Sequence, residues 1–331
     1  MKITEVIGID VSKLVVDVRI HSNQMYCQVE NSNRGFKKML RWCFKNSAYV
    51  QGEMIFVFEH TGLYSYNLAV YLTDQNKPFL MVPGLEVKRS LGITRGKNDK
   101  VDAKKLARYG YRLRDEVRPY SMPSKEIENL KRLLSLRERL VKHRSGYKAS
   151  YKEQKRVFVQ KENKILFETQ QKMIKYLNKQ IDKVEKEMDD IVKSHPRLKR
   201  QYSLITGITS VGPQTALFVI AFTAGFTKFK NSRKFASYCG IAPFPNISGS
   251  SLKGRPKVSH LANKKIKSLL DQCAKNAIIH NHEMKMYYQR RLEDGKQKMS
   301  TINIVRNKLL ARIFAVVTRN TPYVNTMKYA A

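Results

Sequence analysis

The chain has 331 residues and carries 63 Lys and Arg against 27 Asp and Glu, a formal net charge of +36. Hydrophobic residues make up 42% of it, enough to bury a sizeable core, which excludes a chain that is disordered through low hydrophobicity. No apolar run approaches the roughly 18 residues that a membrane span requires, so the charge indicates a polyanionic partner, namely nucleic acid.

The first hundred residues are predicted to form a mixed α/β sheet covered by helices. Residues 6–11 and 14–20 are β-branched runs separated by a short turn at Ser12 and Lys13, which is typical of a β-hairpin. Three more strands and two helices follow, at 26–30, 54–58 and 78–82 and at 35–46 and 63–74. Hairpin strands followed by β-α-β alternation indicate a mixed sheet with helices on its faces.

Residues 124–195 differ from the first segment in composition and in the spacing of their apolar residues. They contain no Pro and one Gly, Gly146, and their apolar residues recur at spacings of three and four. The apolar positions are Ile127, Leu130, Leu134, Val141, Ile174, Leu177, Ile181, Val184, Met188 and Ile191. This pattern predicts two long helices in an antiparallel or intermolecular coiled coil. The charges between these positions fit a solvated helical face and a nucleic-acid contact equally well.

Residues 196–331 are predicted to be mostly α-helical. Two short helices around a Gly-containing turn at 207–212 resemble a helix-hairpin-helix, whose backbone N–H groups would hold a phosphate. A tight turn without a ligand explains the same residues equally simply. A helix at 232–240, a Gly/Ser/Pro loop at 241–256 and helices at 261–279 and 301–317 follow. The chain is thus predicted to comprise segments 1–123, 124–195 and 196–331.

The charge is distributed unevenly along these segments. Residues 201–331 carry a net charge of +17 and only four acids, whereas residues 1–100 carry +5 and nine acids. A carboxylate-based metal site is therefore expected in the first hundred residues or close to them. The basic C-terminal third is expected to provide a polyanion-binding surface.

Four carboxylates in the N-terminal segment are candidates for that site. Asp10 and Glu59 end apolar strands, and Asp99 and Asp102 share one face at the start of a predicted helix. Each acid alone has an ordinary explanation, as a turn, loop or helix-start residue. Converging at one sheet edge, the four would repel one another unless divalent cations neutralised them, and two Mg²⁺ ions held in this way support phosphoryl transfer.

These residues resemble a known family. Segments 7–13 (IGIDVSK), 59–62 (EHTG) and 99–103 (DKVDA) are similar to the signature of the DEDD transposases of bacterial insertion sequences, in particular insertion-sequence family one hundred and ten, related to Piv-type invertases. Asn98 stands where the family commonly has Thr. The resemblance extends over nearly the whole chain. It implies an RNase H-like (RuvC-like) N-terminal domain, a coiled-coil middle and a mostly α-helical C-terminal transposase domain.

A second group of motifs extends the resemblance into the basic third. Segments 238–243 (YCGIAP), 246–251 (NISGSS) and 254–255 (GR) are similar to the family's C-terminal domain, whose Ser-Gly loop carries a nucleophilic serine. Residue-by-residue matching assigns that role to Ser248, although Ser250 and Ser251 are equal rivals on chemistry alone. A flexible Ser/Gly loop without chemistry is the simpler explanation of the composition. Nearby cations would favour a bound phosphate: Lys253, Arg255 and Lys257.

The resemblance also implies an activity and partners. Asp10, Glu59, Asp99 and Asp102 would bind Mg²⁺, Ser248 would form a transient phosphoserine linkage to DNA, and a structured bridge RNA would pair with target and donor DNA. The coiled coil would support a homo-oligomer, a dimer or tetramer. The terminal helix resembles the family's own, and three of its cations are candidate phosphate contacts: Lys296, Lys298 and Arg306.

Localisation and two alternative functions complete the sequence predictions. Widely spaced cysteines, no convincing zinc set of histidines and no secretory pattern predict a cytoplasmic, nucleoid-associated bacterial protein with no membrane partner. One alternative function is a RuvC-like, structure-selective nuclease that uses the acids alone. The other is a non-enzymatic nucleic-acid-binding protein in which the acids only cap helices and form turns.

Overall fold

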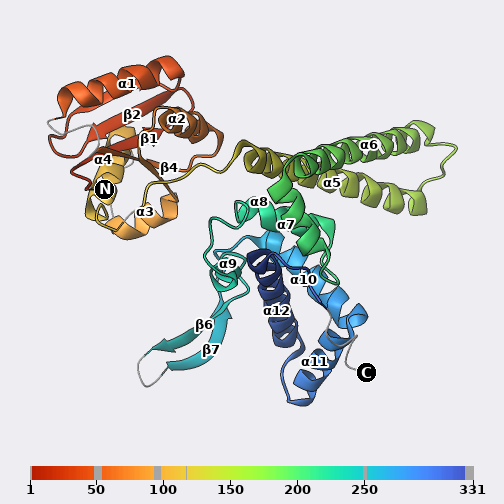
Figure 1. Ribbon diagram of the computed structural model, residues 1–331. Helices are drawn as coiled ribbons and strands as arrows, with labels where there is room; N and C mark the ends of the chain where they lie inside the picture. The colour runs from red at the N-terminus through yellow and green to blue at the C-terminus, as the bar shows by residue number, and fades with distance from the viewer. Residues whose placement is uncertain (1, 48–53, 93–97, 117, 249–251, 325–331) are drawn as a thin grey trace. The chain divides into compact units, whose positions relative to one another are not determined.

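A computed structural model describes residues 2–47, 54–92, 98–116, 118–248 and 252–324. The chain forms two compact units, Met1–Met122 and Pro123–Ala331 (Figure 1). The helical stretch 124–195, predicted as a separate middle segment, lies in the same unit as the remainder of the C-terminal part. No helix in the described part of the chain is long and apolar enough to cross a membrane.

The N-terminal unit contains a sheet and flanking helices. Its elements are β1 (Glu5–Val11), β2 (Val15–Ile20), β3 (Tyr26–Glu30), α1 (Asn33–Asn46), β4 (Met54–Glu59), α2 (Leu63–Asp74), β5 (Phe79–Val82), α3 (Gly84–Leu91) and α4 (Asp99–Arg112). The strand order is β3-β2-β1-β4-β5. β2 pairs antiparallel with β1 and β3, whereas β4 is parallel to both β1 and β5. The predicted mixed sheet is confirmed, and α3 is an element that the sequence did not predict.

Alternation along the strands gives the sheet two buried faces. Ile7, Ile9 and the apolar residues of β2 pack with α1 and α2 on one face. Val6 of β1 and Val57 of β4 pack with α3 and α4 on the other face. The period of two in the strands thus explains why helices cover both faces (Figure 1). The same period places Gly8 and Asp10 on the face that α4 covers.

Gly8 allows α4 to approach β1 at backbone distance. A Cβ atom at this position would lie 2.2 Å from the carbonyl oxygen of Ala103 and 2.3 Å from the backbone nitrogen of Ala107. Both contacts are with helix backbone, which cannot rotate away as a side chain does. The close packing of α4 on β1 therefore requires glycine here.

Replacing Gly8 with Ala is expected to lower the free energy of unfolding of the N-terminal unit by about 3 kcal/mol, because α4 must shift off the sheet. Trp42, the single tryptophan, packs in this unit, so its fluorescence during denaturation measures the change. Gly146→Ala is the control, since nothing lies within 4 Å of a Cβ atom there. It should leave the Trp42 transition unchanged and stabilise α5 by about 1 kcal/mol. An unchanged Trp42 transition in Gly8→Ala would contradict the packing described.

The C-terminal unit is mostly helical, as predicted. Its elements are α5 (Lys125–Val157), α6 (Lys164–Ser194), α7 (Pro196–Thr206), α8 (Pro213–Phe222), α9 (Ser232–Tyr238), β6 (Pro243–Ser248), β7 (Leu252–Val258), α10 (Lys264–His280), α11 (His282–Glu293) and α12 (Lys298–Arg319). α7 and α8 each begin with Pro, whose fixed φ suits the first helical turn. The predicted pair of short helices around a Gly-containing turn is therefore confirmed.

α8 forms the centre of this unit. Every residue from Thr215 to Ala221 is buried, and α5, α7 and α10 pack around the helix. The long helices α5 and α6 lie antiparallel (Figure 1), joined by an ion pair of 2.6 Å between Arg137 Nε and Glu185 Oε1. The buried residues of α5, namely Ile127, Leu130 and Leu134, all lie in its first third and belong to the core around α8.

The segment predicted as a Gly/Ser/Pro loop is instead a two-stranded antiparallel ribbon, β6–β7, which corrects that prediction. Its composition is poor in strand formers, so the ribbon is specified by backbone pairing rather than by side-chain pattern. A register shift between Phe244 and Asn246 interrupts the pairing, so that Phe244 pairs with Lys257 and Asn246 pairs with Gly254.

Candidate functional site

The first turn of α4 presents two of the predicted acids. The side chain of Asn98 accepts a hydrogen bond from the backbone N–H of Lys100 and caps the helix. Asn is among the best N-cap residues, so the start of α4 is well defined. Asp99 and Asp102 follow in the first turn, where the helix dipole favours negative charge.

Asp10 and Glu59 come from neighbouring parallel strands. Asp10 lies one residue before the end of β1, Glu59 is the last residue of β4, and the two strands pair in register. The carboxyl ends of parallel strands meet at one sheet edge, where ligands of α/β proteins commonly bind. Glu59 lies against Gly84, whose missing side chain makes room for it, because a Cβ atom there would be 1.9 Å from Glu59 Oε1.

Asp10 lies within electrostatic range of the other three predicted acids. Burial raises the pKa of Asp10 to about 6, and repulsion from nearby carboxylates adds to this effect. The carboxylates that contribute are Asp102, Asp99, Asp17 and Glu59. Asp10 therefore lies in a half-buried, strongly negative environment that disfavours its own ionised form.

One acid in this group was missed by sequence reasoning. Asp17 lies on β2 directly opposite Asp10 in the antiparallel register and is only 1% exposed. Its Oδ1 atom accepts hydrogen bonds from the Tyr26 hydroxyl at 2.5 Å and from Gln28 Nε2 at 3.1 Å. An acid inside the β-branched run of β2 was the available signal, but its relation to Asp10 depends on the hairpin register.

The donor chemistry of these acids fits a divalent cation. Hard carboxylate oxygens are the ligands that Mg²⁺ prefers, and the Oδ2 atom of Asp17 is buried with no hydrogen-bond partner in the described structure. Within the described residues, however, no three His, Cys, Asp or Glu side chains lie close enough together to hold a metal ion. Asp102 instead forms an ion pair with Lys105, at 2.8 Å between Oδ1 and Nζ. The charges are gathered, but the carboxylates are not arranged as ligands.

The structure places the backbone of Ser248 at the end of β6, in the C-terminal unit. Ser248 pairs with Leu252 across the ribbon. The rival serines, Ser250 and Ser251, lie outside the described residues. The predicted nucleophile and the predicted acids thus belong to different units of the chain.

The predicted phosphate contacts differ in exposure. Arg255, Lys257, Lys296 and Lys298 are exposed, and Lys253 is described only in its backbone, as part of β7. Arg306 is 6% exposed and its guanidinium forms an ion pair with Asp271 of α10. We therefore do not retain Arg306 as a phosphate contact: its charge is used to join α12 to α10.

The turn between α7 and α8 forms a small depression. A pocket of about 350 Å³ is lined by the turn residues from Thr206 to Gly212 and by Asn276 of α10. Ser210 in this turn has φ of +75°, in the left-handed region that only a few residue types adopt readily. The shape suits the predicted helix-hairpin-helix and a ligand-free turn alike.

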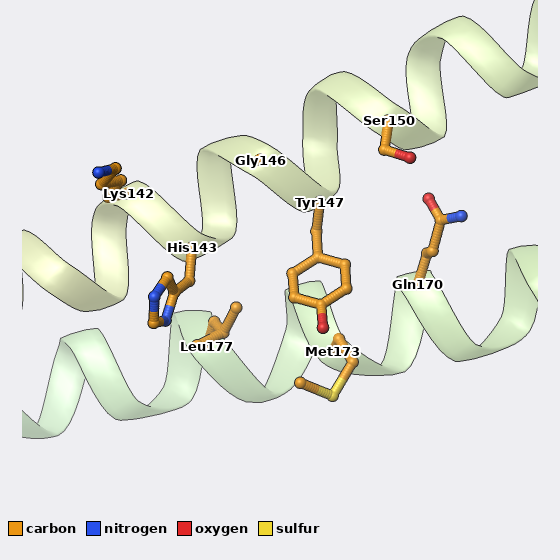
Figure 2. Close-up of a pocket in the computed structure, with 8 residues that line it drawn as sticks. All are labelled: Lys142, His143, Gly146, Tyr147, Ser150, Gln170, Met173 and Leu177. Carbon is orange, nitrogen blue, oxygen red and sulfur yellow. The ribbon is translucent and has the colours of Figure 1, made fainter.

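A larger pocket of about 570 Å³ lies between α5 and α6. Figure 2 shows Tyr147 of α5 pointing towards Met173 of α6, and Ser150 facing Gln170. Gly146 contributes no side chain to fill the space between the helices. The pocket reflects loose packing in this part of the hairpin, and no cluster of charged groups in it suggests chemistry.

Two family models match the chain. The model for DEDD-type transposases of IS110, described as "Transposase", matches residues 7–154. The model described as "Transposase IS116/IS110/IS902 family" matches residues 202–289. The first match includes the four predicted acids together with Asp17, and the second includes Ser248.

Curated relatives give a consistent result. The "Pilin gene-inverting protein" of Moraxella bovis is 26% identical over 334 residues, covering 96% of this chain and 97% of that protein. The protein of the same name from Moraxella lacunata has the same identity and coverage. The "Insertion element IS110 uncharacterized 43.6 kDa protein" of Streptomyces coelicolor is 23% identical over 144 residues, 44% of this chain and 34% of that protein.

Proposed function

Because the chain belongs to the IS110 family of transposases and is a DNA-rearranging enzyme, we propose that it cuts and rejoins DNA with Mg²⁺ and a serine nucleophile, guided by a structured RNA. The acids Asp10, Glu59, Asp99 and Asp102 would serve the metal chemistry, and Ser248 would be the nucleophile. A RuvC-like character of the N-terminal unit is part of the proposal, supported by the strand order β3-β2-β1-β4-β5 and the helices on both faces.

The observation that carries the proposal is the crowding of carboxylates around Asp10. Burial raises the pKa of Asp10 and repulsion from four neighbouring acids raises it further, and such an arrangement is costly unless a cation compensates it. A protein of net charge +36 has many surface cations available to neutralise acids, yet among the described residues only Asp102 of this group forms an ion pair, with Lys105. The retained negative charge supports a site for divalent metal.

The residues of the N-terminal unit would act by holding and orienting. Asp10 and Glu59 are fixed by paired strands, while Asp99 and Asp102 are fixed by a capped helix, so the acids come from rigid elements. When bound, Mg²⁺ would polarise the phosphodiester and stabilise the charge that develops on it. Asp102 would exchange its contact with Lys105 for this role.

The serine step conserves phosphodiester bonds. The hydroxyl oxygen of Ser248 would form a bond to phosphorus while the bond from phosphorus to one deoxyribose oxygen breaks. The serine proton is lost to a base, and the leaving deoxyribose oxygen gains a proton. The released deoxyribose hydroxyl of a partner strand then attacks the phosphoserine and frees the serine. Each step breaks one phosphate ester bond and forms another, so the exchange needs no nucleotide cofactor.

We place the nucleic-acid partners on the basic C-terminal unit. Residues 201–331 carry +17, and Arg255, Lys257, Lys296 and Lys298 are exposed there. Contacts of this kind hold backbones without reading sequence, which suits a system in which RNA pairing selects donor and target DNA. The same proposal includes a homo-oligomer, a dimer or tetramer built on α5 and α6. It also includes a cytoplasmic, nucleoid-associated location.

RNA that co-purifies with the protein tests the guidance. The expected result is one structured RNA species with segments complementary to two DNA sites, enriched over total RNA when sequenced. Recovery should fall steeply with salt, because Lys and Arg contacts to phosphates release counterions. Recovery of only random fragments of cellular RNA would contradict RNA guidance and leave the DNA-rearranging activity in place.

A further inference from the structure

Asp17 uses only half of its hydrogen-bonding capacity although it is almost fully buried. Its Oδ1 atom accepts two hydrogen bonds, from Tyr26 and Gln28, while its Oδ2 atom has no partner in the described structure. It also lies across the strand pair from Asp10, a like charge. Burying such a carboxylate costs stability, so the requirements of folding alone do not account for it.

Tyr26 connects Asp17 to the acidic turn of α4. Its hydroxyl donates to Asp17 Oδ1, and the ammonium of Lys100 lies over its ring at 4.7 Å from the centroid. Lys100 stands between Asp99 and Asp102 in the first turn of α4. Burial and the hydrogen bond to Asp17 raise the pKa of Tyr26 to about 12, so the phenol remains a donor at neutral pH. Tyr26 thus contacts both Asp17, opposite Asp10 on the neighbouring strand, and Lys100, in the first turn of α4.

We propose that Asp17 and Tyr26 are positioning residues of the acidic site, which hold the Asp10 strand and the first turn of α4 near each other so that their carboxylates can close on a divalent cation. The inference rests on the proposed metal chemistry. Outer groups that fix ligands in this way typically contribute about tenfold or more to metal affinity. Asp17 contributes in addition a charge that repels Asp10 without a cation and attracts the cation when it is present.

Binding of Mn²⁺ alone to the full-length protein tests the proposal without any DNA reaction. Free Mn²⁺ is followed by its electron paramagnetic resonance signal during titration. Tyr26→Phe keeps the ring under Lys100 but removes the bond to Asp17, and Asp17→Asn keeps an acceptor for Tyr26 but removes the charge. Each is expected to raise the Mn²⁺ dissociation constant about tenfold with unchanged stoichiometry.

Tyr109→Phe is the matched control. The Tyr109 hydroxyl donates to Glu86 Oε1 at 2.6 Å, a tyrosine–carboxylate bond in the same unit that also joins α4 to a neighbouring element, here α3. This control should bind Mn²⁺ as the unchanged protein does. Denaturation followed by Trp42 fluorescence establishes that each variant is folded. Gln28→Ala removes the exposed second donor to Asp17 without risk to the core, and a smaller weakening is expected.

The possible outcomes separate this inference from the proposed function. If Asp10→Asn weakens Mn²⁺ binding while Tyr26→Phe, Asp17→Asn and Gln28→Ala do not, the positioning role is wrong and the metal chemistry stands. Equal weakening by Tyr109→Phe would also overturn the positioning role, since general loosening of α4 would explain it. If the unchanged protein binds no Mn²⁺, the proposed metal chemistry fails, and the inference fails with it.

Discussion

The Asp10→Asn variant is expected to join DNA strands at least about 10³-fold more slowly than the unchanged protein, a loss of about 4 kcal/mol in transition-state stabilisation. Burial and repulsion from four nearby acids disfavour the charged form of Asp10 in the protein alone, and the proposed metal role requires that charged form. The substitution preserves shape and removes only the charge. The measurement is the rate of product formation from a matched donor and target in the presence of Mg²⁺.

Asp74→Asn is the matched control for this variant, because Asp74 is an exposed acid at the end of α2 in the same unit. It should join DNA at the normal rate. DNA binding should persist in both variants, since neither changes the basic C-terminal unit. Full activity of Asp10→Asn would contradict the proposed role of the acids. Loss of joining with binding retained would exclude the alternative of a protein that only binds nucleic acid.

Replacing Ser248 with Ala is expected to reduce strand joining by a factor on the order of 10⁶, the size of effect that removal of a serine nucleophile produces. It should also abolish the covalent adduct between protein and labelled DNA that denaturing gels detect. Ser250→Ala and Ser251→Ala should retain both, which separates Ser248 from its neighbours. Strand transfer at the full rate without the Ser248 hydroxyl would reject the serine mechanism and assign the phosphoryl transfer to the acids alone.

Much of the N-terminal unit was predictable because its patterns are local. The hairpin of β1 and β2 follows from two β-branched runs and a short turn, and the edge shared by Asp10 and Glu59 follows from strand ends. Asp17 was not predictable as part of the site, because its place opposite Asp10 depends on pairing register, which a single sequence does not show. Helix α3 has only eight residues, too few for periodicity to identify it.

Two features of the C-terminal unit, the β6–β7 ribbon and the partner of Arg306, also depend on contacts that local sequence patterns do not show. Gly, Pro and Ser residues dominate the segment that forms β6 and β7, and such composition is typical of loops, so backbone pairing could not be inferred. Arg306 was a candidate phosphate contact because it lies on a helix that resembles the family's terminal helix. Its actual partner, Asp271, is 35 residues away in the chain, a contact that only the tertiary structure reveals.

The uneven packing of α5 and α6 implies a gradient of stability along the hairpin. The buried residues of α5 lie in its first third, whereas its outer part meets α6 through scattered contacts, such as the Tyr151–Phe167 ring contact and the hydrogen bond between Arg144 and Asn178, beside the pocket of Figure 2. Local unfolding should therefore begin in the outer part of the hairpin and stop at the core around α8. Amide hydrogens of the outer part should exchange fastest. The outer helices can change packing partners at a small free-energy cost while the rest of the unit stays folded.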